Sequence, residues 1–211
     1  MMKKFLKPLR KFNFILILLS LVLSQIALSE PGKKFLILGD SISAGYGVGL
    51  DKKWTSILQR KLDSSGKNLR IINASVNGET TSGGLSRIEN LLKSHSPDYL
   101  LIELGGNDAL RGYPVDKIKS NLIEICKKAS KENVVIMLMQ IKIPPNYGRV
   151  YTQAFESIYN EIADELGILV VPFMLENIAL ESNLMLPDGI HPNEKGQPFI
   201  AEEVYKWLEP F

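Results

Sequence analysis

The chain has 211 residues, of which 45% are hydrophobic and 23% charged, and it contains a single cysteine. These values are typical of one globular domain, and they exclude a disordered or fibrous chain and an internal disulfide framework. The net charge of +2 depends on five of the 25 basic residues, which lie among the first 29 positions without any acid. The remainder has 20 basic against 23 acidic residues, a net charge of −3, so we expect no nucleic-acid partner.

Residues 1–29 have the three-part layout of a secretory signal peptide. The basic start is followed by an apolar run over residues 14–23, and small residues at Ala27 and Ser29 favour cleavage before Glu30. This run is much shorter than the ~20 residues that a helix needs to cross a bilayer. We therefore expect residues 30–211 to form an exported domain without stable membrane insertion, and an uncleaved anchor is the alternative.

Beyond the N-terminus, short apolar runs alternate with longer segments of helical periodicity. The apolar runs predict strands at 35–38, 69–72, 99–104, 134–139 and 168–171. The helical spacing predicts helices at 54–62, 82–93, 115–132, 151–166 and about 195–209. Strands that are apolar throughout are typical of a parallel sheet buried on both faces. The alternation predicts one three-layer α/β/α sandwich around a five-stranded parallel sheet, with Cys126 in its core.

Three segments that directly follow predicted strands carry residues suited to acyl transfer. Ligands of parallel α/β sheets bind beyond the carboxyl ends of the strands. Residues 39–45 place Ser41 after the first strand, and residues 73–80 place Gly78, with its backbone N–H, after the second. Asn107, after the third, offers a carboxamide N–H pair. Each segment alone is equally typical of a turn, loop or helix cap.

A fourth segment, residues 188–193, precedes the last predicted helix and carries Asp188 and His191. Hydrolysis through a serine needs a base that takes the hydroxyl proton and an acid that orients this base. One loop could supply both, and a capped turn is the alternative. His95 is the other histidine, and we expect it on the surface at a helix end. Two histidines and one cysteine support no zinc site, so we expect neither metal nor cofactor.

Taken together, the four segments resemble the four ordered sequence blocks of the SGNH (GDSL) hydrolases. The blocks are Gly39-Asp-Ser41, Gly78, Gly105-Gly-Asn107-Asp and Asp188-Gly-Ile-His191. The stretches 36–46, 103–112 and 139–148 are also similar to periplasmic members described as acyl-CoA thioesterases, lysophospholipases and arylesterases. The resemblance extends over about residues 33–209. It implies a flavodoxin-like fold and cofactor-free hydrolysis of acyl esters and thioesters in the periplasm.

The resemblance also implies a role for each motif residue. Ser41 would be the nucleophile, and His191 the general base oriented by Asp188. The backbone N–H groups of Ser41 and Gly78, with the side chain of Asn107, would form the oxyanion hole. One departure is Glu79, where the resemblance leads us to expect aspartate, and it indicates a small change in loop geometry.

Apolar residues after the fourth strand are candidates for an acyl-chain groove. Ile141, Ile143, Pro144 and Tyr147 lie there, and Leu110 follows Asn107 closely enough to join them. Loop packing is the alternative, since single exposed hydrophobic residues are normal.

The segment 109–113 is a candidate lid, because Gly112 would give it freedom to move.

Small-molecule esters or thioesters are the expected substrates, and a monomer is the expected state. The alternatives are a carbohydrate O-acetylesterase or an acyltransferase on the same fold, and a lipid-binding protein without turnover.

Overall fold

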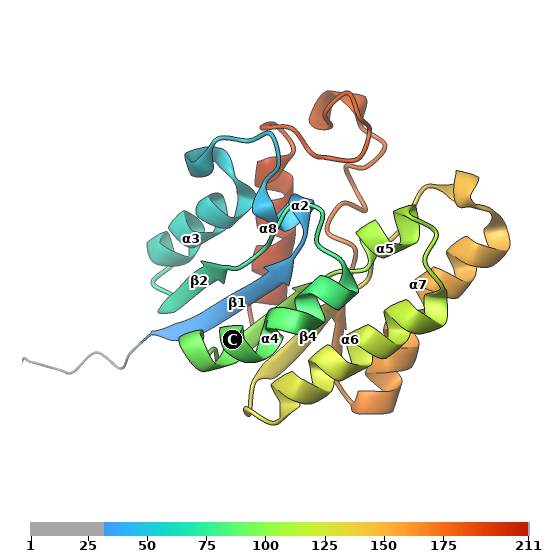
Figure 1. Cartoon of the computed structure of the whole chain (residues 1–211). Helices are drawn as coiled ribbons and strands as arrows, with labels where there is room; N and C mark the ends of the chain where they lie inside the picture. Colours follow the sequence, from blue (N-terminus) through green and yellow to red (C-terminus); the bar gives the residue numbers. More distant parts are fainter. Residues whose placement is uncertain (1–31, 211) are drawn as a thin grey trace, which may run out of the picture. The chain divides into compact units, whose positions relative to one another are not determined.

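The computed structural model describes residues 32–210, and the compact unit that they form begins at Lys33. Its centre is one parallel sheet with the strand order β2–β1–β3–β4–β5 (Figure 1). The strands are β1 (Lys33–Gly39), β2 (Leu69–Asn73), β3 (Tyr99–Glu103), β4 (Val135–Met139) and β5 (Leu169–Val171). The predicted five-stranded parallel sheet is confirmed, and each strand boundary lies within two residues of the predicted one.

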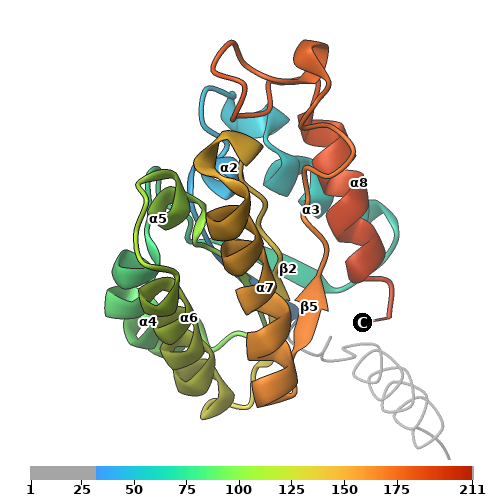
Figure 2. The same ribbon diagram turned by 90° about the vertical axis from the view of Figure 1, so that its right-hand side faces the viewer.

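Helices cover both faces of the sheet, as the prediction of a three-layer sandwich requires (Figure 2). One layer contains α4 (Thr81–His95), α6 (Val115–Ser130) and α7 (Arg149–Leu166), and the other contains α3 (Trp54–Ser64) and α8 (Gln197–Trp207). Two short helices, α2 (Ser41–Ala44) and α5 (Gly106–Leu110), were not predicted as such. The remaining turns are the 3₁₀ segments η1 (Leu50–Lys52), η2 (Pro145–Tyr147) and η3 (Ser182–Leu184).

Burial differs between the centre and the edges of the sheet. All five residues of β3 are buried, as are the last five of β1. In the edge strands β2 and β5, by contrast, most side chains are only half-buried or exposed. The expectation of strands buried throughout is therefore wrong for the edges, because an edge strand lacks a neighbour on one side.

The free edge of β2 is covered by the side chain of Gln59 from α3. Its Nε2 donates to the carbonyl of Leu69 at 3.1 Å, and its Oε1 accepts from the N–H of Ile71 at 2.7 Å. One carboxamide thus occupies the two backbone positions that a sixth strand would use. Edge strands need such protection, because unpaired backbone groups invite pairing with another chain.

The strand order reverses beside β1, which lies between β2 and β3. Connections diverge from such a switch point, and the space at the carboxyl ends of the strands becomes available to a ligand. The segments after β1, β2 and β3 meet there, and these are the segments that carry Ser41, Gly78 and Asn107.

Other predictions concern residues away from this edge. Cys126 is fully buried in α6 as predicted, and burial raises the pKa of its thiol to about 12. His95 ends α4 as predicted, but it is half-buried. None of the helices formed by residues 32–210 combines the length and apolar character needed to cross a membrane. The predicted signal peptide, residues 1–29, lies outside the described residues.

Candidate active site

Ser41 is the first residue of α2, a single helical turn that begins directly after β1. The turn is fixed at both ends. At its start, Oδ1 of Asp40 accepts a hydrogen bond from the N–H of Ile42 at 2.9 Å, which caps the helix. At its end, Gly45 has a φ of 69° and donates to the carbonyls of Ser41 and Ile42, a conformation that favours glycine. The local sequence therefore holds Ser41 in one orientation at the edge of the sheet.

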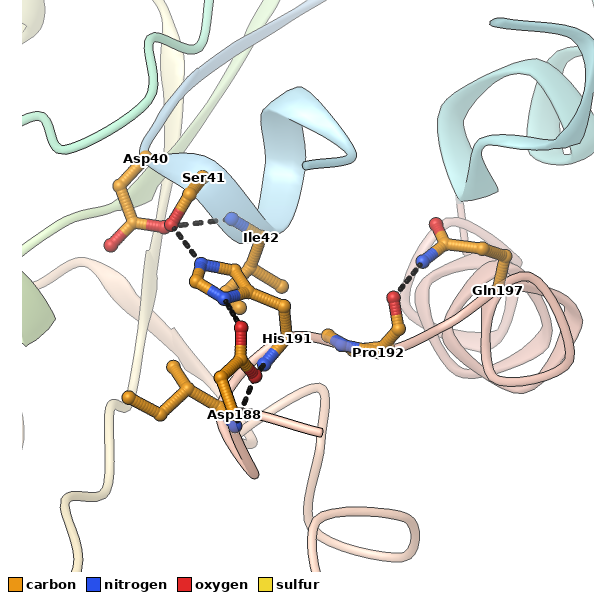
Figure 3. A network of polar contacts seen from close by, with 8 residues as sticks. Asp40, Ser41, Ile42, Asp188, His191, Pro192 and Gln197 are labelled. Atoms are coloured by element: carbon orange, nitrogen blue, oxygen red, sulfur yellow. Dashed lines mark hydrogen bonds and ion pairs between the residues drawn. The ribbon is translucent and has the colours of Figure 1, made fainter. Parts of the chain in front are cut away.

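Ser41, His191 and Asp188 form a continuous chain of hydrogen bonds (Figure 3). The Oγ of Ser41 lies 2.8 Å from Nε2 of His191, and Nδ1 of His191 lies 2.8 Å from Oδ2 of Asp188. Ser41 and His191 are 150 positions apart in the chain. The structure thus brings together the three residues that were predicted to form a triad, with the two ring nitrogens of His191 facing the predicted partners.

The charge of Asp188 fixes the direction of these hydrogen bonds. Burial by itself would raise the pKa of Asp188, but the backbone N–H groups of His191 and Ile190 and the ring of His191 outweigh it and lower the pKa to about 2. An ionised carboxylate can only accept hydrogen bonds. Nδ1 of a neutral His191 must therefore carry the ring proton and donate it to Asp188. Nε2 is then left as an acceptor for the hydroxyl of Ser41.

Two side-chain amides hold the loop that carries His191. Nδ2 of Asn193 donates to the carbonyl of Met185 at 2.9 Å. Gln197, only 1% exposed, donates from Nε2 to the carbonyl of Pro192 at 3.1 Å (Figure 3). Its Oε1 accepts from the N–H of Trp54 at 2.9 Å. This second amide ties the loop to the start of α3. Sequence reasoning missed Gln197, because a single glutamine at a helix start carries no recognisable signal.

The three predicted oxyanion donors follow the neighbouring strands β1, β2 and β3. Gly78 has a φ of 73°, and within residues 32–210 we find no hydrogen-bond acceptor for its N–H. Asn107 lies in the first turn of α5, and its Nδ2 donates one hydrogen to Oδ2 of Asp40 at 3.0 Å. The second hydrogen of this amide is left for another acceptor. That these two groups and the N–H of Ser41 together stabilise a negative charge beside Ser41 stays a prediction.

Glu79, which follows Gly78, anchors this loop to α4. Its Oε2 accepts a hydrogen bond from Nε of Arg87 at 2.6 Å, and its side chain is only 10% exposed. The next residue, Thr80, caps α4 by accepting from the N–H of Gly83 at 3.2 Å. Glutamate is thus long enough to form a partly buried ion pair with the neighbouring helix.

The five candidate substrate-binding residues fall into two groups. Ile141 and Ile143 are 5% and 7% exposed and belong to the core, as the alternative of loop packing describes. Leu110 is half-buried, whereas Pro144 and Tyr147 are exposed. The hydroxyl of Tyr147 donates to the carbonyl of Leu110 at 3.0 Å, which joins η2 to the end of α5. In this arrangement, a ligand at the surface would contact Leu110, Pro144 and Tyr147 but not the two buried isoleucines.

Tyr46 is a neighbour of the triad to which the sequence assigned no role. Its ring centroid lies 4.6 Å from that of His191, with an angle of 42° between the planes. The stretch 36–46 that carries the family resemblance ends at this residue. An aromatic ring at this distance can interact favourably with the protonated form of the imidazole.

A surface hollow of about 610 Å³ lies on the β2 side of the site. It is lined by the end of α2, the segment from η1 into α3, the end of β2 and the loop that leads to Gly78. Sequence reasoning missed it, because its lining comes from separate segments that have no motif in common.

The described residues offer no evident metal-ligand set. Within residues 32–210, no group of three or more His, Cys, Asp or Glu side chains is arranged to hold a metal ion. His95 lies at the other end of the sheet, near the amino ends of the strands. Its carbonyl accepts a hydrogen bond there from Nζ of Lys34, near the start of β1.

The chain is similar to known proteins over most of its length. Residues 37–198 match the GDSL-like Lipase/Acylhydrolase family. The chain is 43% identical to an arylesterase of Vibrio mimicus, over 90% of this chain and 96% of that protein. It is also 43% identical to thioesterase 1/protease 1/lysophospholipase L1 of Escherichia coli strain K12, over 83% of each. The crystal structure of the esterase EstA from Pseudoalteromonas sp., inhibited by monoethylphosphonate, superimposes with a TM-score of 0.81 at 43% identity, covering 83% of this chain and 98% of that one. The chain therefore belongs to the GDSL-like lipase/acylhydrolase family of ester hydrolases.

Proposed function

We propose that this protein hydrolyses carboxylic esters and thioesters of acyl chains through an acyl-enzyme on Ser41. The observation that carries the proposal is the chain of contacts from Asp188 through His191 to Ser41, with two heavy-atom distances of 2.8 Å. Both distances are already suited to proton transfer.

The first half-reaction is the transfer of the acyl group to Ser41. Nε2 of His191 takes the hydroxyl proton while Oγ attacks the carbonyl carbon, and Asp188 stabilises the imidazolium that forms. The carbonyl oxygen becomes an oxyanion, which the N–H groups of Ser41 and Gly78 and Nδ2 of Asn107 stabilise. His191 then protonates the leaving alcohol or thiol, and the carbon–oxygen or carbon–sulfur bond breaks.

The second half-reaction returns the enzyme to its starting state. A water molecule takes the place of the leaving group, and His191 removes a proton from it as it attacks the ester carbonyl. The same donors stabilise the second oxyanion. Collapse of this intermediate releases the carboxylic acid, and Ser41 regains its proton from His191.

The substrate class follows from the relatives and from the surface beside Asn107. The similar proteins are named as an arylesterase and as a thioesterase and lysophospholipase. Next to the site, Leu110, Pro144 and Tyr147 offer partly exposed apolar surface, which we assign to the acyl chain. Ile141 and Ile143 are buried in the core and would contact an acyl chain only after movement of the residues that cover them.

We further propose that the protein is exported to the periplasm, where residues 30–211 act as a monomer. The support is the basic and apolar layout of residues 1–29, with small residues at Ala27 and Ser29. Expression of the full chain in a Gram-negative host, followed by fractionation and N-terminal sequencing, tests this. A periplasmic product that begins at Glu30 is expected, and a membrane-bound product that retains residues 1–29 would contradict it.

The catalytic proposal is tested by hydrolysis of p-nitrophenyl esters from acetyl to palmitoyl, by the protein and by Ser41→Ala. We expect activity that rises with chain length and is lost in the variant. Activity on the acetyl ester alone would favour an O-acetylesterase. Undiminished activity of Ser41→Ala would overturn the assignment of the nucleophile.

Labelling with a serine-directed fluorophosphonate separates an enzyme from a lipid-binding protein. We expect one equivalent of label on Ser41 and none on Ser41→Ala. Absence of labelling in the parent protein would favour binding without turnover.

A further inference from the structure

A second carboxyl group, that of Glu103, lies buried beneath the active site and takes no part in the mechanism above. Glu103 is the last residue of β3 and is only 2% exposed. Its Oε2 accepts a hydrogen bond from the N–H of Asp40 at 3.1 Å. A Cβ atom on Gly39 would lie 2.5 Å from this oxygen, so the glycine before Asp40 makes room for Glu103. The carboxyl group thus lies directly below the turn that presents Ser41.

Asp40 is also buried, at 5% exposure, and its two oxygens have separate partners. Oδ1 accepts from the N–H of Ile42 at 2.9 Å, and Oδ2 accepts from Nδ2 of Asn107 at 3.0 Å. Both oxygens of Asp40 therefore accept hydrogen bonds, and one of them contacts the amide of a predicted oxyanion donor.

The two carboxyl groups share one negative charge. Burial raises the pKa of Glu103 well above its usual range, and the nearby charge of Asp40 raises it further. Burial also raises the pKa of Asp40, whereas hydrogen bonds from Ile42, Glu103 and Asn107, and a positive charge on His191 when its ring is protonated, lower it. Two buried carboxyls in contact do not both ionise at neutral pH. Asp40 accepts from the N–H of Ile42 and from Nδ2 of Asn107, and Glu103 is the more deeply buried of the two, so we place the charge on Asp40 and the proton on Glu103.

We propose that Glu103 is a positioning residue, whose protonated carboxyl group keeps Asp40 ionised and thereby turns the amide of Asn107 with its N–H toward the oxyanion hole. The proposal deepens the hydrolytic function proposed above and rests on it.

The physical reason lies in the symmetry of a carboxamide. The –NH₂ and C=O ends of Asn107 have nearly the same shape, so packing distinguishes them poorly. An ionised Asp40 accepts hydrogen bonds and attracts only the –NH₂ end. A protonated Asp40 could donate to the C=O end instead, and the flipped amide would present no donor to the oxyanion. A hydrogen bond that protonated Glu103 donates to Asp40 lowers the pKa of Asp40 and so keeps the proton away from this contact.

The test is a double-mutant cycle of Glu103→Leu with Asn107→Ala, measured as kcat and KM for p-nitrophenyl butyrate. Asn107→Ala should lower kcat by about 10²–10³-fold, as loss of one oxyanion donor does. Glu103→Leu should lower kcat at least about tenfold with little change in KM, because the amide of Asn107, which Glu103 is proposed to orient, stabilises the transition state. If Glu103 acts through Asn107, the double variant should match Asn107→Ala within about threefold. Multiplied losses would overturn the proposal.

Glu103→Gln supplies the conservative comparison. Its Nε2 can donate to Asp40 and its Oε1 can accept the N–H of Asp40, so it should recover most of the kcat that Glu103→Leu loses. Equal losses in the two variants would assign Glu103 a merely structural role and contradict the proposal.

If Glu103→Leu does not fold, Asp40→Asn provides a second test of how Asn107 is oriented. An asparagine can still cap α2 through its C=O, but it then presents –NH₂ to Asn107. Two donors would then face each other, so the amide of Asn107 should flip and place its C=O where its –NH₂ group lies in the parent. The flipped amide presents no donor to the oxyanion. We expect a loss of kcat close to that of Asn107→Ala, without a further loss in the double variant; an unchanged kcat would refute the orienting role of Asp40. All these comparisons presuppose that Ser41→Ala is inactive, so failure of the proposed function is recognised separately.

Discussion

Thr81 donates two hydrogen bonds to a single buried carboxylate, that of Asp108. Its N–H lies 2.9 Å from Oδ2, and its hydroxyl lies 2.7 Å from Oδ1. Asp108 follows Asn107 in α5, and Thr81 begins α4 three positions after Gly78. The contact therefore joins the two segments that carry the predicted oxyanion donors, and it places a negative charge at the N-terminus of α4, where the helix dipole favours it.

Thr81→Val should lower the free energy of unfolding by about 1–3 kcal/mol, because it leaves Oδ1 of Asp108 and Nδ2 of Asn121 without their shared hydroxyl partner. We also expect kcat to fall several-fold, since the segments that carry Gly78 and Asn107 lose one of the hydrogen bonds that join them. Urea denaturation and p-nitrophenyl ester hydrolysis measure the two effects.

The matched control is Thr152→Val. Oγ1 of Thr152 is buried, and we find no hydrogen-bond partner for it within residues 32–210. Its replacement by an isosteric methyl group should change the unfolding free energy by less than about 0.5 kcal/mol. Equal losses in the two variants would mean that the hydrogen bonds of Thr81 contribute nothing specific.

Asp188→Asn should lower kcat by about 10³–10⁴-fold while the loop stays in place, because an amide can turn either end toward His191 and no longer fixes its tautomer. The variant also tests a contribution to stability. The folded-state pKa of Asp188 is about 2, below its ordinary value of 3.8. Ionised Asp188 therefore stabilises the fold above about pH 4, and this contribution is lost as the pH falls toward 2.

We expect this contribution to be at most about 1 kcal/mol, because 39% of the side chain is exposed and solvent screens the charge. Chemical denaturation of the parent and of Asp188→Asn at pH 7 and at pH 2 measures it. The difference between them at pH 7 should shrink at pH 2. A difference that does not depend on pH would show that the charge of Asp188 does not stabilise the fold.

Periodicity in the sequence was sufficient to predict the sheet and the five long helices. It could not predict α2 and α5, which have four and five residues, because such short segments complete little more than one turn. Their ends are set by particular residues: the side chain of Asp40 caps α2, and Gly105 with a φ of 113° precedes α5. Both helices lie at the site, so the least periodic part of the chain is also the functional part.

The predicted triad came from short motifs, whereas the groups that hold it depend on contacts between distant segments. Gln197 bonds to Trp54, 143 positions away, and Glu103 bonds to Asp40, 63 positions away. The sequence around a glutamine or glutamate in an amphipathic or apolar segment does not indicate which distant residue forms a hydrogen bond with it. Glu103 was even counted within an apolar run that predicted a strand. Only the packing of that strand against β1 reveals its buried carboxyl group.

Tyr46→Ala should lower kcat several-fold, because the ring that lies 4.6 Å from His191 stabilises the protonated form of the imidazole during catalysis. Tyr46→Phe keeps the aromatic face and should retain most of the activity. The measurement is kcat for p-nitrophenyl butyrate, with thermal melting to verify the fold. If the phenylalanine variant were as impaired as the alanine variant, the hydroxyl and not the ring face would be the important group.

Gln59→Ala should destabilise the fold by about 1–2 kcal/mol and promote self-association, because it removes the partners of the N–H of Ile71 and the carbonyl of Leu69 at the edge of the sheet. Gln59→Glu should have an intermediate effect, since a carboxylate can accept from Ile71 but cannot donate to Leu69. Gln153→Ala, on the exposed surface of α7, is the matched control for loss of a glutamine.

Light scattering during gentle heating, together with urea denaturation, measures both effects. Aggregation of Gln59→Ala below the temperature at which the parent protein aggregates is expected, with Gln153→Ala unchanged. The kcat of soluble Gln59→Ala should stay near that of the parent, because Gln59 bonds to β2 near its start, whereas the catalytic groups lie beyond the carboxyl ends of the strands. A variant that aggregates no earlier than the parent and is equally stable would show that Gln59 does not protect β2.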